Sequence, residues 1–214
     1  MALPRRGALG ALLLTAACAG RRPEPPPAPA RPPSYGHLTP LRLAVGRIEM
    51  VPATDPALTR AMPPAPLAPA DVVRIMAEDR LSAAGGPGLA RFRTLRATLA
   101  REAASGGGVF TRASERLTCI LHCRLDILSE EGAPAGFAEA EIRRTALRPA
   151  GSQAEKAAAA EEIVRQAGDD LNVEFEYQLR RNLRALLQPA PPGGAGEATA
   201  PAGAAPAPVL EPRP

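Results

Sequence analysis

Apolar and polar residues alternate over several stretches of this chain, and alternation with a period of two predicts β-strands. The clearest stretch is 116–130, where every second residue from position 117 is apolar or a thiol. Its predicted buried side consists of Leu117, Cys119, Leu121, Cys123, Leu125 and Ile127. Its predicted outer side carries Thr118, His122, Arg124 and Asp126, with Ile120 among them. This stretch is therefore expected to cover a hydrophobic core with one face only.

Three further strands are expected. A turn at 132–134 leads to a return strand over 136–148, whose buried side is formed by Ala138, Ala140 and Ile142. The stretch 41–51 is one strand with Gly46 as a candidate bulge, and its buried side is formed by Leu41, Leu43 and Val45. The stretch 91–102 places on its buried side Leu95, Ala97 and Leu99. Arg93 and Arg101 lie near its edges.

Two helices are predicted from apolar residues spaced three and four apart. The first begins near Pro69 or Ala70 and ends at Gly85-Gly86, with an apolar side formed by Val72, Ile75, Met76 and Ala83. The second begins at a capping box, Ser152 with Glu155, and runs toward Leu187. Its apolar stripe consists of Ile163, Val164, Ala167, Leu171, Phe175, Leu179, Leu183 and Leu186. Gly168 is a point at which this helix could kink.

The predicted order is β-α-β-β-β-α, which gives an α+β fold in which two helices cover a mostly antiparallel sheet as a two-layer sandwich. We place this domain at 41–188. A proline-rich tether over 18–40 precedes it, and a Pro/Ala/Gly-rich tail over 189–214 follows it. We expect both flanks to be disordered because they contain little that could form a core.

The formal charge of +4 does not indicate a nucleic-acid partner. The basic excess lies in the termini, and the stretch 41–188 carries 20 basic and 19 acidic residues. Aromatic residues make up 3% of the chain and Trp is absent, which argues against base-stacking surfaces and aromatic sugar-binding clefts. We therefore expect no nucleic-acid partner.

Candidate chemistry is sparse, and we predict no catalytic residue, cofactor or metal. The chain has two His residues, and no pairing of a nucleophile with a base can be proposed. Cys119, His122 and Cys123 could form a metal cluster on a helix. On a strand the two thiols are about 13 Å apart and His122 faces the other side. The strand interpretation favours buried thiols, with a disulfide to another chain or a metal site as alternatives.

The N-terminus has the pattern of an export signal. Arg5 and Arg6 precede a short apolar stretch over 7–17, which is too short to span a membrane, and Cys18 follows. Residues 14–18, Leu-Thr-Ala-Ala-Cys, resemble the bacterial lipobox, which implies a signal peptide over 1–17 and lipid attachment at Cys18. Membrane contact through acyl chains on Cys18 is the consequence. The alternative is ordinary cleavage after Ala17 or Ala19, which would give a soluble periplasmic protein.

The residue after Cys18 is Ala19 and not Asp. By resemblance to lipoprotein sorting in Gram-negative bacteria, this favours the outer membrane, with the domain on its periplasmic face. The whole layout over residues 10–188 resembles small Gram-negative envelope lipoproteins. Examples are the auxiliary lipoproteins of ABC-type envelope transport systems and the lipopolysaccharide-assembly lipoprotein. The resemblance implies a non-catalytic interaction module with an envelope protein partner, auxiliary to a transport or outer-membrane assembly complex.

Two alternatives concern what the domain binds. The first is a carrier of lipid or another small ligand in a groove between the sheet and the helices. It predicts an apolar pocket that is not filled by Leu121, Leu125, Phe175 and Leu179. The second is a partner-docking surface on the C-terminal half of the last helix, which also carries Val173, Tyr177, Arg180, Arg181 and Arg184.

Overall fold

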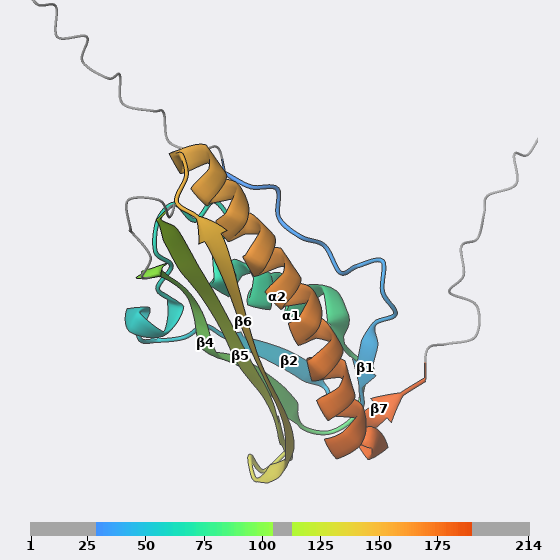
Figure 1. Ribbon diagram of the computed structural model, residues 1–214. Coiled ribbons are helices and arrows are strands. Elements are labelled where there is room, and N and C mark those ends of the chain that lie inside the picture. The colour runs from blue at the N-terminus through green and yellow to red at the C-terminus, as the bar shows by residue number, and fades with distance from the viewer. Residues whose placement is uncertain (1–28, 105–112, 190–214) are drawn as a thin grey trace, which may run out of the picture.

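The computed structural model describes residues 29–104 and 113–189 of the 214-residue chain (Figure 1). These residues form an α+β fold with two sheets and two long helices, and most strand pairs are antiparallel. The predicted signal peptide, Cys18 and the tail after residue 189 lie outside the described residues.

The larger sheet contains the predicted hairpin. Its order is β2 (Arg47–Val51), β4 (Leu89–Ala104), β5 (Ser114–Leu128) and β6 (Pro134–Pro149). β4, β5 and β6 pair antiparallel, while the short β2 pairs parallel with the first part of β4. In this register Cys119 lies opposite Leu99 on β4 and opposite Arg144 on β6. The strands are long and twisted, so they cross the whole domain in Figure 1.

The prediction of a single strand over 41–51 was wrong, because the chain divides there between two sheets. β1 (Leu41–Leu43) belongs to a small sheet of order β3-β1-β7, with β3 (Leu81–Ala83) and β7 (Leu187–Gln188), whereas β2 belongs to the larger sheet. Gly46 lies in the break. A Cβ at this glycine would lie 3.1 Å from the backbone oxygen of Gly86, so the close approach of two loops favours glycine here.

The first helix, α1 (Pro69–Arg80), is shorter than predicted. Residues 81–83 form β3 instead, because the backbone of β1 offers them a parallel partner. Ala83 consequently leaves the helical stripe and is exposed. The segment between β2 and α1 also contains the short 3₁₀ helix η1 (Pro56–Thr59).

The second helix, α2 (Gln153–Asn182), begins at the predicted capping box. Ser152 accepts a hydrogen bond from the backbone of Glu155, whose carboxylate accepts one from the backbone of Ser152. The helix ends before the predicted Leu187, because the short 3₁₀ helix η2 (Arg184–Leu186) and β7 follow it.

The core lies between the larger sheet and the two helices. Every residue predicted on the inner side of β5 is buried, as are Ala138 and Ala140 on β6. Phe92 on β4 meets Phe175 on α2 edge to face, with ring centroids 5.7 Å apart. The side chains of Leu121, Leu125, Phe175 and Leu179 are also fully buried. The space where the carrier hypothesis placed its groove is therefore filled at these four positions.

A β-bulge in β4 changes the predicted alternation of that strand. The register with β5 shifts between Thr94 and Arg96, so Leu95 is an extra residue and is only half-buried. Ala97 and Leu99 are buried as predicted. Before the bulge the even-numbered residues of β4 face the core, whereas after it the odd-numbered ones do. The buried residues before the bulge are Ala90 and Phe92, which the sequence pattern did not identify.

Residues 29–40, predicted to belong to a free tether, contact the domain. The backbone N–H of Ala30 donates to the carbonyl of Pro66, and that of Tyr35 donates to the carboxylate of Asp79 at 2.6 Å. Tyr35 is buried, with 3% of the residue's surface exposed. The packed part of the chain therefore begins before residue 41.

A buried arginine joins this segment to both helices. The side chain of Arg80, at the end of α1, is 2% exposed. It donates to the side chain of Asn172 on α2 at 2.9 Å, to the carbonyl of Thr39 and to the carboxylate of Glu176. Burial lowers the pKa of Arg80, and the charge of Glu176 opposes that effect. The guanidinium is satisfied by three acceptors from two segments, α2 and the N-terminal segment, which are distant in sequence.

Gly168 does not kink α2, which runs unbroken from Gln153 to Asn182. A Cβ at this position would lie 2.4 Å from Cγ1 of Val72 on α1 and 2.5 Å from the hydroxyl of Tyr35. At this glycine, α1 and the N-terminal segment therefore approach the backbone of α2 closely.

We expect Gly168→Ala to lower the free energy of unfolding by about 1–3 kcal/mol, measured by urea denaturation. Alanine in the middle of an unobstructed helix would instead raise stability by about 1 kcal/mol, so the sign of the change is diagnostic. Gly36→Ala is a matched control, because its Cβ would meet nothing closer than the Ser34 hydroxyl at 3.8 Å. An increase in stability for Gly168→Ala would contradict the close packing.

Candidate functional site

The face of the larger sheet that points away from the helices is open. It carries the outer side of β5, and Thr118, His122, Arg124 and Asp126 lie there as predicted, each only partly buried. The alternate residues of β4 and β6 lie beside them. This open face has two halves that differ in how their charges are arranged.

The half nearer the β5–β6 turn is internally neutralised. Glu139 contacts the imidazole of His122 at 2.7 Å and accepts from Arg124 at 2.9 Å, and Asp126 accepts from Arg124 and Arg93 at 2.7 Å. Burial alone would raise the pKa of Glu139, but the hydrogen bonds from His122 and Arg124 lower it below its usual value. The guanidinium of Arg124 also stacks over the ring of Phe137. Charges in this half are paired with one another.

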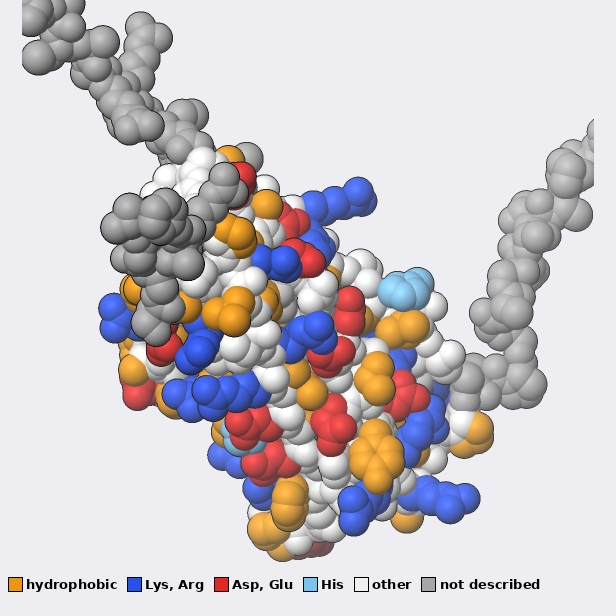
Figure 2. Space-filling model, viewed as in Figure 1, with side chains coloured by type: hydrophobic (Ala, Val, Ile, Leu, Met, Phe, Trp, Pro, Cys, Tyr) orange, Lys and Arg blue, Asp and Glu red, His pale blue; other side chains and the backbone are white. Residues whose placement is uncertain are grey.

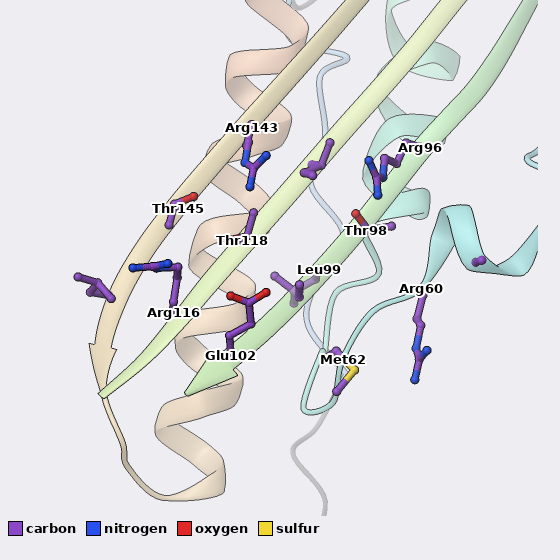
Figure 3. Close-up of a pocket in the computed structure, with 14 residues that line it drawn as sticks. Arg60, Met62, Arg96, Thr98, Leu99, Glu102, Arg116, Thr118, Arg143 and Thr145 are labelled. Atoms are coloured by element: carbon purple, nitrogen blue, oxygen red, sulfur yellow. The ribbon is translucent and has the colours of Figure 1, made fainter. Parts of the chain in front are cut away.

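The other half contains a hollow of about 950 Å³, shown in Figure 3. It spans β4, β5 and β6 and is bounded on one side by the segment that follows η1. Its charged lining residues are Arg60, Arg96, Arg116, Arg143 and Glu102. Four cations thus surround the hollow with one carboxylate. We call this surface the arginine hollow.

None of these four arginines forms an ion pair within 4.0 Å with any residue in the ranges 29–104 and 113–189. Arg116 is the cross-strand neighbour of Glu102, yet its side chain extends away from that carboxylate in Figure 3. Arg96 on β4 and Arg143 on β6 both extend toward the central strand β5. The four guanidiniums retain donors for a group outside the described chain.

The floor of the arginine hollow is built of small and apolar side chains. Ala100, Thr118 and Thr145 form one row across the three strands, and Ile120 lies in the next. Met62 and Leu147 also line the hollow and are 37% and 61% exposed. Cationic donors, hydroxyl groups and exposed apolar surface therefore lie together in the arginine hollow.

The bulge at Leu95 is what places Arg96 in this site. If the alternation of β4 ran on without a bulge from Phe92, Arg96 would lie on the same side as Phe92 and would face the core. The sequence pattern did not reveal the arginine hollow, because its members come from four separate segments. The available signal was weak: Arg96, Arg116 and Arg143 each fall on the predicted outer side of their strands.

The cysteines lie where the strand interpretation placed them. Cys119 and Cys123 are free thiols in the core, and His122 lies between them on the open face. Burial raises the pKa of Cys119 to about 12, and burial followed by the charge of Glu139 raises that of Cys123. Within the described residues, no group of three His, Cys, Asp or Glu side chains is arranged to hold a metal ion.

The residues predicted to form a docking surface on the C-terminal half of α2 lie on two different sides of the helix. Leu171, Phe175 and Leu179 are buried against the sheet, whereas Val173 and Tyr177 are 68% and 54% exposed. Elsewhere on this helix acidic and basic side chains are paired, as in Arg180 with Glu176. Figure 2 shows the resulting mixture of red and blue over the surface that includes α2. Partner docking on α2 stays a prediction.

A second charged cluster joins the start of β5 to the first turn of α2. Glu115 on β5 accepts from Arg101 at 2.8 Å and contacts the ammonium of Lys156 at 2.7 Å. Hydrogen bonds from Lys156 and Arg101 lower the pKa of Glu115. The carboxylate is 16% exposed and both of its partners are mostly covered, so we interpret the cluster as structural.

Neither α1 nor α2, nor any other helix in the described ranges, has both the length and the apolar content needed to cross a membrane.

No family model matches the chain, and no curated protein matches it in sequence. Among solved structures it is similar to an uncharacterized lipoprotein B from Nitrosomonas europaea, with 14% identity, 65% of this chain and 86% of that chain covered, and a TM-score of 0.36. It is also similar to a minor lipoprotein from Acinetobacter baumannii, with 15% identity, 64% of this chain and 94% of that chain covered, and a TM-score of 0.32. A Xanthomonas campestris protein of family DUF330 has 12% identity, with 71% of this chain and 93% of that chain covered, and a TM-score of 0.31. Because these TM-scores are below 0.5, we base the function on this chain's own residues.

We expect Glu115→Gln to lower the free energy of unfolding at pH 7 by about 1–2 kcal/mol. The pKa of Glu115 is lower in the folded chain than in the unfolded chain, so its stabilising effect is present above the unfolded value. That effect is lost as the pH falls through the folded value. Urea denaturation between about pH 7 and pH 3 should therefore show the two proteins converging in acid. Glu130→Gln, at an exposed position in the β5–β6 turn, should differ little from wild type throughout. A difference in the free energy of unfolding between wild type and Glu115→Gln that persists at low pH would contradict this account.

Proposed function

We propose that this chain is a lipid-anchored envelope lipoprotein whose α+β domain is a non-catalytic interaction module. The observation that carries the proposal is the arginine hollow, because a surface with exposed apolar side chains and four guanidiniums that pair with no described carboxylate is suited to binding. We place the domain on the periplasmic face of the outer membrane, as an auxiliary to an envelope transport or assembly complex.

The contacts of residues 29–40 support a short tether. Pro29 comes eleven positions after Cys18, and this stretch of chain can span at most about 40 Å. The carbonyl of Arg31 accepts from Arg165 on α2, and the described chain begins near the first turns of that helix in Figure 1. β6 leads directly into α2, so Leu147 near the end of β6 lies toward the same end of the domain. A lipid on Cys18 would therefore keep the arginine hollow close to the bilayer.

We expect Cys18→Ala to move the protein from the membrane fraction to the soluble fraction in its native host, because the acyl chains supply the anchor. Intact-mass analysis of the wild-type protein should show a diacylglyceryl group and an N-acyl chain on a mature form that begins at Cys18. Cys119→Ala is the control, since it removes a thiol from the core and should leave the protein with the membranes. If Cys18→Ala were still found in the membrane fraction, lipid anchoring would be contradicted.

We expect a photo-crosslinking amino acid at Thr145, on the floor of the arginine hollow, to form one discrete adduct with an envelope protein in intact cells. The adduct should be lost when Arg143→Gln is added, because the partner would then lack a charged contact. The same amino acid at Val173, exposed on α2, is the matched control and should form no such adduct. Equal labelling from both positions, or none from Thr145, would contradict the proposed binding face.

A further inference from the structure

We propose that the partner of the arginine hollow is an extended acidic segment of a protein, with carboxylates alternating with apolar side chains. This inference rests on the proposed function and names the chemistry that the site would recognise. It is argued from the charge, the spacing and the floor of the hollow.

Charge identifies the ligand as an anion. Among the residues that line the hollow, four are arginines and one is a glutamate, which leaves a local excess of three positive charges. The other half of the same sheet face is neutralised by its own ion pairs, so it does not attract an anion in the same way. Arginine is also suited to carboxylates, because its planar fork can donate two parallel hydrogen bonds.

Spacing indicates that the anion is long. Arg96 lies level with residue 122 of β5, and Arg143 lies level with residue 120. Arg116 is six positions from the level of Arg96, so the cations extend over about 20 Å along the sheet at roughly 3.3 Å per residue. One phosphate group would reach only one end of this array. A peptide of eight extended residues is about 26 Å long and could contact all of it.

The floor explains why apolar residues are expected between the acids. Ile120, Met62 and Leu147 present apolar surface among the guanidiniums, while Ala100, Thr118 and Thr145 leave the centre recessed. Successive side chains of an extended peptide point to opposite sides, so acids directed to the rim and apolar residues directed to the floor would use both features. A flat bilayer surface would meet the rim and leave this recess empty.

The experiment uses the whole mature chain with Cys18→Ala, so that it can be handled without detergent. The probe is a fluorescein-labelled eight-residue peptide of alternating glutamate and leucine, and the measurement is fluorescence anisotropy at about 50 and 150 mM salt. We expect binding that weakens at the higher salt. We expect Arg96→Gln with Arg143→Gln to weaken it about tenfold, since two charge-assisted contacts are lost.

Two variants test whether the site itself carries the effect. Glu102→Gln removes the carboxylate from the lining and should tighten binding about twofold to threefold, because a repulsive charge disappears. Arg74→Gln is the matched control. It removes one positive charge on the exposed side of α1, where Arg74 pairs with Asp71 and Glu78, and should leave binding unchanged.

Several outcomes would overturn the inference. They are absence of peptide binding, equal binding of a glutamine-for-glutamate peptide, or an equal loss of affinity in Arg74→Gln. Binding of inorganic phosphate or of phosphatidylglycerol vesicles that depends on Arg96 and Arg143, with no peptide binding, would assign the site to a phosphate or a membrane surface instead. If the peptide fails while the Thr145 adduct forms in cells, the proposed function stands and only the chemistry inferred here is wrong.

Discussion

The fold depends on covering one face of a long antiparallel sheet. The inner side of β5 is apolar from Leu117 to Ile127, and water must be excluded from it over that length. α2 covers this face over its length, and α1 fills the remaining width beside it. The two helices can approach closely because Gly168 has no side chain. The buried Arg80 on α1 then donates to acceptors on α2 and on the N-terminal segment at their junction. With both helices on one side, the opposite face of the sheet is left open.

The open face is thus a consequence of the core. Residues that alternate with buried residues on β5 and β6 must point outward, which places Arg116 and Arg143 on the same side. β4 reaches the same result only through its bulge, which reverses the parity after Thr94 and turns Arg96 outward. A change of one residue in strand register therefore determines whether this charge lies in the core or in the arginine hollow. Bulges are enriched near functional sites, and this position fits that tendency.

Regular periodicity was enough to predict the hairpin, both long helices, the capping box and the inner side of β5. It was not enough where tertiary contacts decide the backbone. Residues 81–83 continue a helical pattern but become a strand, because β1 offers them hydrogen bonds. Tyr35 lies in a proline-rich stretch for which the sequence predicts no packing. Its side chain nevertheless packs against Gly168, 133 positions away in the chain. The arginine hollow could not be predicted for the same reason, since its residues come from four segments that only the folded sheet brings together.

Burial separates the arginines with a structural role from those that the binding proposal uses. Arg80 and Arg101 are 2% and 12% exposed and hold carboxylates that are themselves mostly covered, so removing either guanidinium would leave a partly buried charge without its partner. Arg60, Arg96, Arg116 and Arg143 are exposed and pair with no described carboxylate, so folding gains little from them. Their mutual repulsion is unfavourable in the free domain and would be relieved by an anion. This arrangement fits selection for a ligand better than selection for stability.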